Sequence, residues 1–297
     1  MVLRGKNKTV LASLRAQELR ADKFHARSLF DGVYGPKDPT AAVKRLSLPE
    51  LDKLTERTAH DVLRHANYEC SRHLFSPLLK LYESRSKAGK LTPKHAAMII
   101  KHANLALKYN NPETAFQILK HGIRAGAITN AHSSALLKIA EDVALPPKGE
   151  LRNNKAYVNT IGGDLLDLAV SRGVLGKAHV KPLLKIAGGY ADGRPDTAAP
   201  FYAAAIKAGN LDPAQYGNVF YRMSTKKSLS TGVGVSDNPL RSAVVLKHGV
   251  DSGALSVSAV KPLFSELKKD ADRQFLVWGT KPGEEIVAIA KKYGVTV

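Results

Sequence analysis

The sequence is poor in several residue types, and each shortage excludes a class of protein. Cys70 is the one cysteine among 297 residues, so the chain cannot build an internal disulfide framework and a reducing compartment is expected. No apolar run approaches the ~18 residues that a membrane-spanning helix needs. The first residues also lack the apolar core of a secretory signal. We therefore expect neither a disulfide-stabilised secreted domain nor a membrane partner.

Sequence motifs of catalysis and cofactor binding are also missing. The chain has no Gly-x-Ser-x-Gly, no His-Glu-x-x-His and no Walker sequence. A Gly-x-Gly within 231–236 lacks the third glycine and the preceding strand of a nucleotide-binding turn. No residues combine as nucleophile, base and orienting group. We expect a protein that is not an enzyme, with no cofactor and no small-molecule substrate.

One group of residues could be considered as a zinc site. Cys70 and His73 supply two ligand types at a suitable spacing, but no second paired motif accompanies them. His60 and His65 lie five residues apart and do not share a helix face. We therefore expect no bound metal.

Acidic residues are scarce relative to basic ones. Lysine and arginine number 45 against 26 aspartates and glutamates, for a net charge of +19. Such an excess implies an anionic partner, with nucleic acid first and an anionic membrane surface or an acidic protein second. A basic surface without a specific partner is the plain alternative.

One short sequence motif, the repeat motif, recurs five times along the chain. Each copy has a glycine, one free residue, a leucine or isoleucine, and then usually Thr, Asp or Ser. The glycines stand roughly 40 residues apart, at Gly89, Gly126, Gly173, Gly209 and Gly253. A glycine after an apolar run ends a helix in the left-handed region, and Thr, Asp or Ser can cap the next helix. The repeat motif therefore predicts a helix, a tight turn and a second helix, as in helical repeat proteins.

Apolar residues at helical spacing fill the intervals between these glycines, and no alternating strand pattern is present. Segments rich in Gly, Pro, Ser or Asn predict inserted loops at 145–154, 188–195 and 225–238. We predict an all-α fold, a superhelical solenoid of about six helical hairpins over residues 41–297. A basic N-terminal extension over residues 1–40 precedes it.

The extension is basic and contains few acids. Its cations before position 30 are Arg4, Lys6, Lys8, Arg15, Arg20, Lys23 and Arg27. An Arg-rich, acid-poor segment is typical of organellar import signals. It is equally typical of a basic arm that becomes ordered on RNA. Both interpretations stay open at this point.

The segment 111–130, with the sequence NPETAFQILKHGIRAGAITN, resembles pentatricopeptide-type helical hairpins. The resemblance extends in degenerate form over about residues 75–270, and tetratricopeptide repeats share much of the pattern. In the pentatricopeptide family, polar residues near the start of each repeat's first helix read RNA bases. The matching positions here are Met98, Ala135, Pro182, Asn218 and Pro262. Only Asn218 could hydrogen-bond a base edge, so binding to the RNA backbone is expected rather than base-by-base reading.

Histidines stand six residues after the glycine in the first three copies, at His95, His132 and His179. They could form a polar stripe that contacts RNA. We favour the plainer interpretation, in which a polar residue of the first helical turn satisfies local backbone groups. Lysines of the repeat helices, including Lys181 and Lys185, could contact phosphates or simply form a solvated helix face.

The resemblance implies a function as well as a fold. Degenerate, basic repeat proteins of this kind are similar to those recruited into mitochondrial ribosomes and RNA-processing assemblies. We therefore expect a non-catalytic structural subunit in the mitochondrial matrix that binds rRNA or another structured RNA through its phosphates and docks neighbouring subunits. The alternative is a protein–protein adaptor of tetratricopeptide type in a non-ribosomal complex, with its charge directed at acidic peptides.

Overall fold

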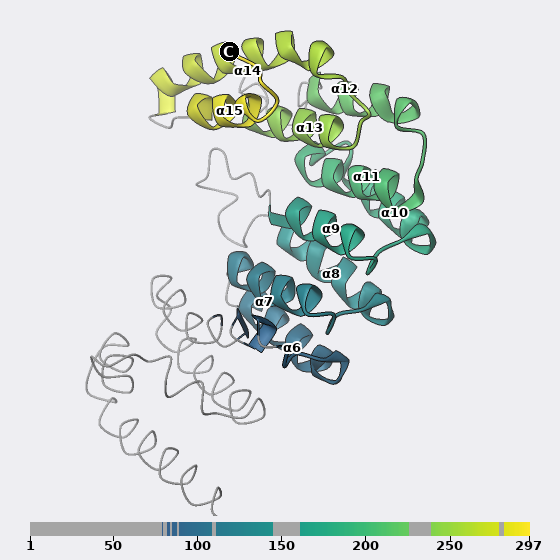
Figure 1. Ribbon diagram of the computed structural model, residues 1–297. Helices are drawn as coiled ribbons and strands as arrows, with labels where there is room; N and C mark the ends of the chain where they lie inside the picture. The colour runs from purple at the N-terminus through teal and green to yellow at the C-terminus, as the bar shows by residue number, and fades with distance from the viewer. Residues whose placement is uncertain are drawn as a thin grey trace, which may run out of the picture. The chain divides into compact units, whose positions relative to one another are not determined.

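The computed structural model describes residues 79, 82–83, 85–87, 89–108, 111–144, 161–225, 239–278 and 282–297. Every regular element in these ranges is helical, and none of these residues forms a strand, which confirms the all-α prediction (Figure 1). The chain divides into two compact units, Met1–Ile128 and Thr129–Val297. The basic extension over 1–40 and the considered zinc ligands of 60–73 lie outside the described residues.

In the first unit, helices α6 (Ala96–Lys108) and α7 (Pro112–Arg124) pack against each other, and a short 3-10 turn, η1 (Pro93–His95), leads into α6. Asn111 starts α7 as its sequence suggests, because its Oδ1 accepts a hydrogen bond from the Thr114 N–H at 3.1 Å. Ile99, Ile118 and Leu119 are fully buried between the helices. This unit therefore presents a helical hairpin with an apolar seam.

The second unit contains eight α-helices and three 3-10 turns in its described residues. Their bounds are η2 (Asn130–His132), α8 (Ser133–Ala144), α9 (Ile161–Ser171), η4 (Lys177–His179), α10 (Val180–Tyr190), α11 (Pro195–Gly209), η5 (Pro213–Tyr216), α12 (Gly217–Thr225), α13 (Pro239–Asp251), α14 (Val257–Trp278) and α15 (Pro282–Lys291).

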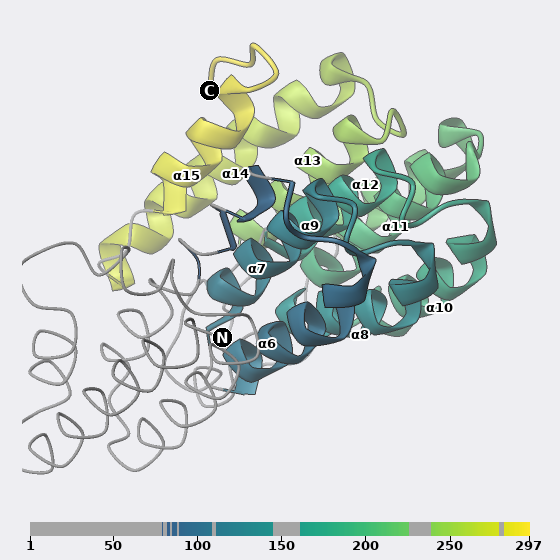
Figure 2. The same ribbon diagram turned by 60° about the horizontal axis from the view of Figure 1, so that its bottom comes forward.

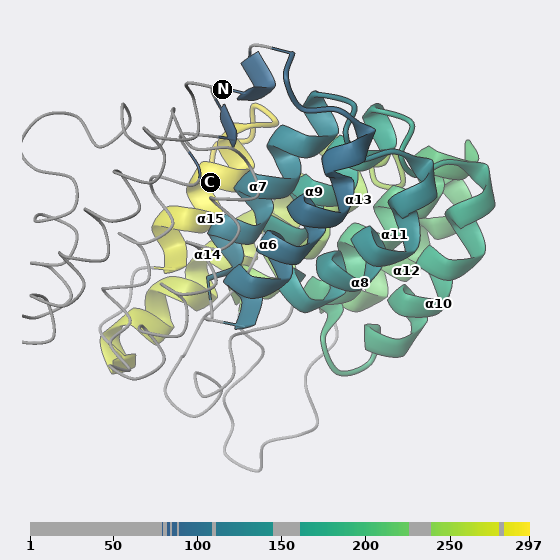
Figure 3. The ribbon, with the colours of Figure 1, turned by 90° about the horizontal axis from the view of Figure 1, so that it is seen from below.

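These helices pack in consecutive pairs, α8 with α9, α10 with α11, α12 with α13 and α14 with α15. The second helices of the pairs also contact one another in the order α9, α11, α13, α15 (Figure 1, Figure 2 and Figure 3). We call these four helices the second-helix row. Helix α11 contacts α9, α10 and α13. Its buried face is rich in alanine, including Ala199, Ala203 and Ala204, because small side chains let three neighbours approach.

The repeat motif forms the predicted turns. Gly89, Gly126, Gly173 and Gly253 all have positive φ, between 65° and 77°. The residue after the glycine donates a backbone hydrogen bond across the last turn, as from Ala127 N–H to the Gly122 carbonyl at 2.9 Å. The apolar residue of the repeat motif then packs inward, and Leu91, Ile128 and Leu175 are buried.

The fourth copy departs from the prediction. Gly209 is the last residue of α11, and the left-handed residue is instead Asn210, with φ 50°. Packing explains the glycine, because a Cβ at position 209 would lie 2.6 Å from Val180 Cγ2 of α10. Asparagine tolerates the left-handed conformation better than most residues, so the turn shifts by one position without a glycine.

The predicted loop at 188–195 is also shorter than expected. Helix α10 continues through Gly188 and Gly189 to Tyr190, and α11 already begins at Pro195. The Tyr190 hydroxyl donates to Glu141 Oε1 at 2.7 Å and so ties the last turn of α10 to α8. The segment 145–154 and the residues from 226 to 238 lie outside the described residues.

Candidate nucleic-acid interface

The three repeated histidines occupy equivalent places in their own turns. The Nδ1 of His95 accepts a hydrogen bond from the Thr92 N–H at 3.0 Å, that of His132 from the Thr129 N–H at 3.2 Å, and that of His179 from the Gly176 N–H at 3.0 Å. Each histidine thus reaches back three residues to a backbone donor that the helix leaves free. This is the role that Glu or Gln has in a capping box.

This geometry matches the local interpretation favoured from the sequence. An Nδ1 that accepts a hydrogen bond belongs to a neutral ring, and burial lowers the pKa of His95 from its usual value. The ring is half-buried in all three turns. These side chains therefore have a structural task without any RNA, and RNA contact by them stays a prediction.

The capping predicted for the later copies is confirmed by direct side-chain bonds. Asp212 Oδ1 accepts from the Ala214 N–H at 3.1 Å, and Ser256 Oγ accepts from the Ala259 N–H at 3.2 Å. The turns therefore satisfy free backbone N–H groups in two ways. An aspartate or serine before the helix accepts from an N–H of the first turn, and a histidine in the first turn accepts from the N–H of the residue before the helix.

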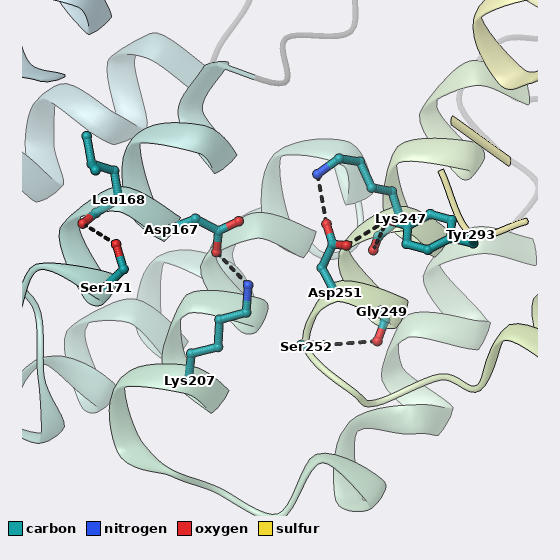
Figure 4. Close-up of polar contacts among 9 residues, drawn as sticks. All are labelled: Asp167, Leu168, Ser171, Lys207, Lys247, Gly249, Asp251, Ser252 and Tyr293. Atoms are coloured by element: carbon teal, nitrogen blue, oxygen red, sulfur yellow. Dashed lines mark hydrogen bonds and ion pairs between the residues drawn. The ribbon is translucent and has the colours of Figure 1, made fainter. Parts of the chain in front are cut away.

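Charged side chains join helices within the second-helix row (Figure 4). Lys207 Nζ on α11 contacts Asp167 Oδ1 on α9 at 2.7 Å, across 40 residues of sequence. On α13, Lys247 Nζ contacts Asp251 Oδ2 at 2.9 Å. Tyr293, just after α15, donates to Asp251 Oδ1 at 2.7 Å. Adjacent members of the row are therefore linked by polar side chains as well as by apolar packing.

The electrostatics of Asp251 follow from these contacts. Burial works to raise its pKa, but hydrogen bonds from Lys247 and Tyr293 outweigh that effect and leave the pKa below its usual value. Burial and the bond to Asp251 raise the pKa of Tyr293. The carboxylate is therefore charged and the phenol neutral at neutral pH.

A third polar group sits at the start of α11. Asp196 is 4 % exposed, and its Oδ2 lies 2.9 Å from Arg194 Nη2 and 3.8 Å from Arg241 Nε of α13. The buried carboxylate thus has two guanidinium neighbours. Much of the charge of the second-helix row is accordingly neutralised within the row itself.

Helix α10, the first helix of its pair, shows a different pattern. Lys177, Lys181 and Lys185 recur at four-residue intervals through η4 and α10, and all three are exposed. No acidic residue occurs from 177 to 190. The opposite face of α10 buries Leu183 and Ala187. The structure therefore places the predicted Lys181 and Lys185 on one solvent-facing cationic stripe.

The positions that would read bases are not a polar set in the structure. Met98 and Ala135 are half-buried, and Pro182, Asn218 and Pro262 are exposed. Asn218 lies in the first turn of α12, close in sequence to the exposed Tyr221 and Arg222. Nothing at these positions supplies a repeated hydrogen-bonding code.

Sequence reasoning missed the contacts of the second-helix row. The sequence did contain one signal of close packing in this region. Lys-His-Gly occurs at 120–122 and again at 247–249, and its glycine stands four residues before a repeat glycine each time. Both glycines of this motif are needed for packing. A Cβ at Gly122 would meet Ile128 and Ile99 at 3.0 Å, and one at Gly249 would meet Leu255 Cδ1 at 2.6 Å. The pairing of Lys247 with Asp251 follows from their i, i+4 spacing, whereas the partner Tyr293 does not.

Two further properties concern the described part of the chain. No group of three or more His, Cys, Asp or Glu side chains there is arranged to hold a metal ion. Within the same ranges, no helix is both long and apolar enough to cross a membrane.

Comparison with known proteins ends without a match. No protein-family model matches the chain, no curated protein is similar to it, and no solved structure resembles its fold at a significant level.

Proposed function

We propose that this chain is a non-catalytic structural subunit of an RNA–protein assembly, of the kind represented by an organellar ribosome. In this proposal it contacts RNA phosphates through exposed lysines and contacts neighbouring proteins through its helical surfaces. The proposed location is the mitochondrial matrix, on the basis of the Arg-rich segment 1–40 and the resemblance to pentatricopeptide-type hairpins.

The observation that carries the proposal is the uneven distribution of charge between the second-helix row and the segment formed by η4 and α10. In the second-helix row, Asp167, Asp196 and Asp251 neutralise nearby cations. On η4 and α10, by contrast, three exposed lysines stand in a segment, 177–190, that contains no acidic residue. A protein that needed only a stable repeat core would gain nothing from such a stripe, whereas a polyanion would be attracted to it.

The architecture in this proposal is a superhelical solenoid of about six helical hairpins. Support comes from the equivalent turns, the consecutive helix pairs and the contacts along the second-helix row. In a solenoid each repeat packs on its neighbours, and the result is an extended surface suited to docking. Basic lysines on such a surface would follow an RNA backbone without reading its sequence.

The decisive experiment is sedimentation of the native protein from a mitochondrial lysate. Under the proposal, the protein moves with ribosomal or other ribonucleoprotein particles in a sucrose gradient, and nuclease treatment shifts it to lighter fractions. A protein that stays in light fractions before nuclease treatment contradicts membership of such a particle.

A binding assay on the purified chain separates the RNA proposal from the adaptor alternative. We expect binding to unrelated RNAs with similar affinity and with a steep decline as salt increases. Binding to poly-glutamate but to no RNA at low salt would favour the adaptor of tetratricopeptide type.

A further inference from the structure

The most exposed aromatic side chain among the described residues lies on α12. Tyr221 is 50 % exposed, and the other exposed large apolar side chain of these ranges, Val257, is 40 % exposed. Asn218, Arg222 and Thr225 are exposed as well and share one side of the helix with Tyr221, because residues three or four apart lie on the same side. We call Asn218, Tyr221, Arg222 and Thr225 the α12 open face.

The opposite side of α12 is held in the core. Phe220 and Met223 are buried and belong to one apolar cluster with Val245 of α13. The ring of Phe220 lies 6.3 Å from the ring of Tyr202 on α11, at an interplanar angle of 68°, an edge-to-face arrangement typical of aromatic packing. Because this packing fixes the rotation of α12, the ring of Tyr221 is held outside the core.

Tyr221 occupies a repeat position that carries lysine in two other copies. It stands twelve residues after the glycine of its repeat motif, and the same position holds Lys138 in the second copy and Lys185 in the third. All three side chains are exposed. On α8 the exposed Asp142 follows Lys138 by one turn, so the charge is mixed there. The inference below is therefore confined to α10 and α12.

Helices α10 and α12 both contact α11, and they lie close to each other. Tyr190 on α10 and Val219 on α12 pack against the same apolar cluster, to which α11 also contributes. The exposed lysines of η4 and α10 are Lys177, Lys181 and Lys185. The cationic stripe and the α12 open face thus belong to consecutive repeats of one compact unit.

This combination of groups suits a single-stranded nucleic acid. Every base has a flat face that stacks on an aromatic ring, and single-strand-binding proteins combine such rings with cations that follow the backbone. The Arg222 guanidinium can bind a phosphate through two parallel hydrogen bonds. The Asn218 amide can both donate to and accept from a base edge. In a duplex the base faces are hidden within the stack, so an outward-facing ring gains nothing there.

A protein partner fits this surface less well. Energetic centres of protein interfaces are clusters of large side chains that their neighbours seal from water. On the α12 open face, the ring of Tyr221 stands among an amide, a guanidinium and a hydroxyl. The charge of Arg222 and of the α10 lysines attracts phosphates. An unpaired RNA strand is therefore the occupant that the composition favours.

We propose that the α12 open face and the α10 lysines bind a single-stranded segment of RNA, in which Tyr221 stacks on an unpaired base and Lys181 and Lys185 contact phosphates. This inference rests on the proposed function and narrows its partner from RNA in general to an unpaired strand. The ring adds affinity through stacking, and the lysines add it through charge. The two contributions differ in salt dependence, since only the charged contacts release counterions.

The test combines substitutions in the full chain with changes to the RNA. Tyr221→Leu removes the ring, Tyr221→Phe keeps it, and a third variant carries Lys181→Gln with Lys185→Gln. The charge control carries Lys261→Gln with Lys269→Gln, which remove two exposed lysines of α14. The probes are a single-stranded RNA of about twelve nucleotides, the same ribose-phosphate strand without its bases, and the same strand in a duplex. Circular dichroism checks that every variant remains helical, as leucine and glutamine are good helix formers.

We expect Tyr221→Leu to weaken binding of the intact single strand by roughly 5- to 100-fold, the loss of one stacked base. Its binding to the abasic strand and to the duplex should be unchanged, because neither offers a free base face. Tyr221→Phe should bind like the unmodified chain. The variant at Lys181 and Lys185 should instead lower the slope of log affinity against log salt by about 1.4, on the intact and abasic strands alike, which is the contribution of two phosphate contacts. The charge control should retain the slope of the unmodified chain.

Binding of the unmodified chain to any of the three RNAs tests the proposed function, and the variants test the further inference. Undiminished binding of the intact strand by Tyr221→Leu would overturn the stacking role. An equal loss on the intact strand, the abasic strand and the duplex would also overturn it, since no base face would be involved. A loss in Tyr221→Phe as large as that in Tyr221→Leu would assign the effect to the hydroxyl instead of the ring. An equal change of slope in the α10 variant and the charge control would assign the phosphate contacts to net charge alone.

Discussion

Gly163 on α9 faces the imidazole of His248 on α13 so closely that a Cβ at position 163 would lie 2.5 Å from His248 Cε1. The same Cβ would lie 3.3 Å from Pro200 Cβ of α11. His248 is 1 % exposed, so its ring has no open space to move into. The glycine therefore sets how closely three members of the second-helix row approach.

Gly163→Ala should destabilise the second unit by about 1–3 kcal/mol, because an inserted methyl group in a close-packed core forces side chains or backbone to shift. Urea unfolding followed by circular dichroism measures the change. The matched control is Gly188→Ala on α10, where a Cβ meets nothing within 4 Å. That substitution should be neutral or slightly stabilising. Equal stability of the two variants would contradict the role assigned to Gly163.

The burial of His248 leads us to expect that the folded chain loses stability in acid. Burial, together with the nearby cation Lys247, lowers the pKa of His248 from 6.5 to about 3, while Asp251 opposes the shift. The unfolded chain therefore binds a proton between these values that the folded chain does not, so stability is complete above pH 6.5 and is lost as pH falls toward 3. Between pH 6.5 and 4.5 the expected loss is about 2–3 kcal/mol.

The measurement for His248 is urea unfolding at several pH values, on the unmodified chain and on His248→Leu. The difference between the two curves isolates this residue from the other titrating groups, including the paired Asp251. The Leu variant should have the flatter pH dependence. Parallel curves would show that His248 does not control acid unfolding.

Tyr293→Phe tests the link between α13 and the segment after α15. The variant loses the hydroxyl that donates to Asp251 Oδ1 at 2.7 Å and contacts the Lys247 carbonyl oxygen at 3.2 Å. We expect a cost of about 1–2 kcal/mol, since the half-buried carboxylate loses a donor. Tyr221→Phe is the control, because Tyr221 is 50 % exposed and should change stability little. A loss of the same size in both would rule out a specific role for the Asp251 contact.

The histidine turns can be tested by exchanging His132 for two different residues. His132→Ala removes the acceptor for the Thr129 N–H and should cost about 0.5–2 kcal/mol. His132→Glu supplies the usual capping-box acceptor and should recover most of that loss. RNA affinity gives a second readout, because a glutamate would repel phosphates if this position touched RNA. Unchanged RNA affinity in the Glu variant is the outcome that the capping role predicts.

Substitutions in the turn after α11 distinguish the cost of backbone strain from the cost of close packing. Asn210 has φ 50°, so Asn210→Gly should be tolerated, whereas Asn210→Val should cost about 1–2 kcal/mol. Gly209→Ala should also be destabilising, because of the close approach to Val180. Thermal unfolding ranks the three variants. A tolerated Asn210→Val would show that this residue does not have to hold the left-handed conformation.

The sequence predicted the turns better than the contacts between helices. Four glycines were correctly identified as helix stops, because a left-handed residue after an apolar run leaves a strong local signal. The error at Gly209 arose because glycine also serves close packing, and only the position of Val180 distinguishes the two uses. The backward bonds of His95, His132 and His179 were expected in kind but not in detail, since histidine is an unusual residue for that position. The contacts of Asp167 with Lys207 and of Asp251 with Tyr293 join residues 40 and 42 apart, and no local pattern encodes such pairs.

The equivalent turns make segments of this chain exchangeable in principle. The residues 119–128 and 246–255 share Leu-Lys-His-Gly, a left-handed glycine and a following inward-facing Ile or Leu. Each turn carries its own stop signal and its own recess for the returning side chain, and the exchange removes one non-local contact, that of Asp251 with Tyr293. A chimaera that swaps these two segments should fold, and a library of such swaps would show which parts of the surface are generic and which belong to one position.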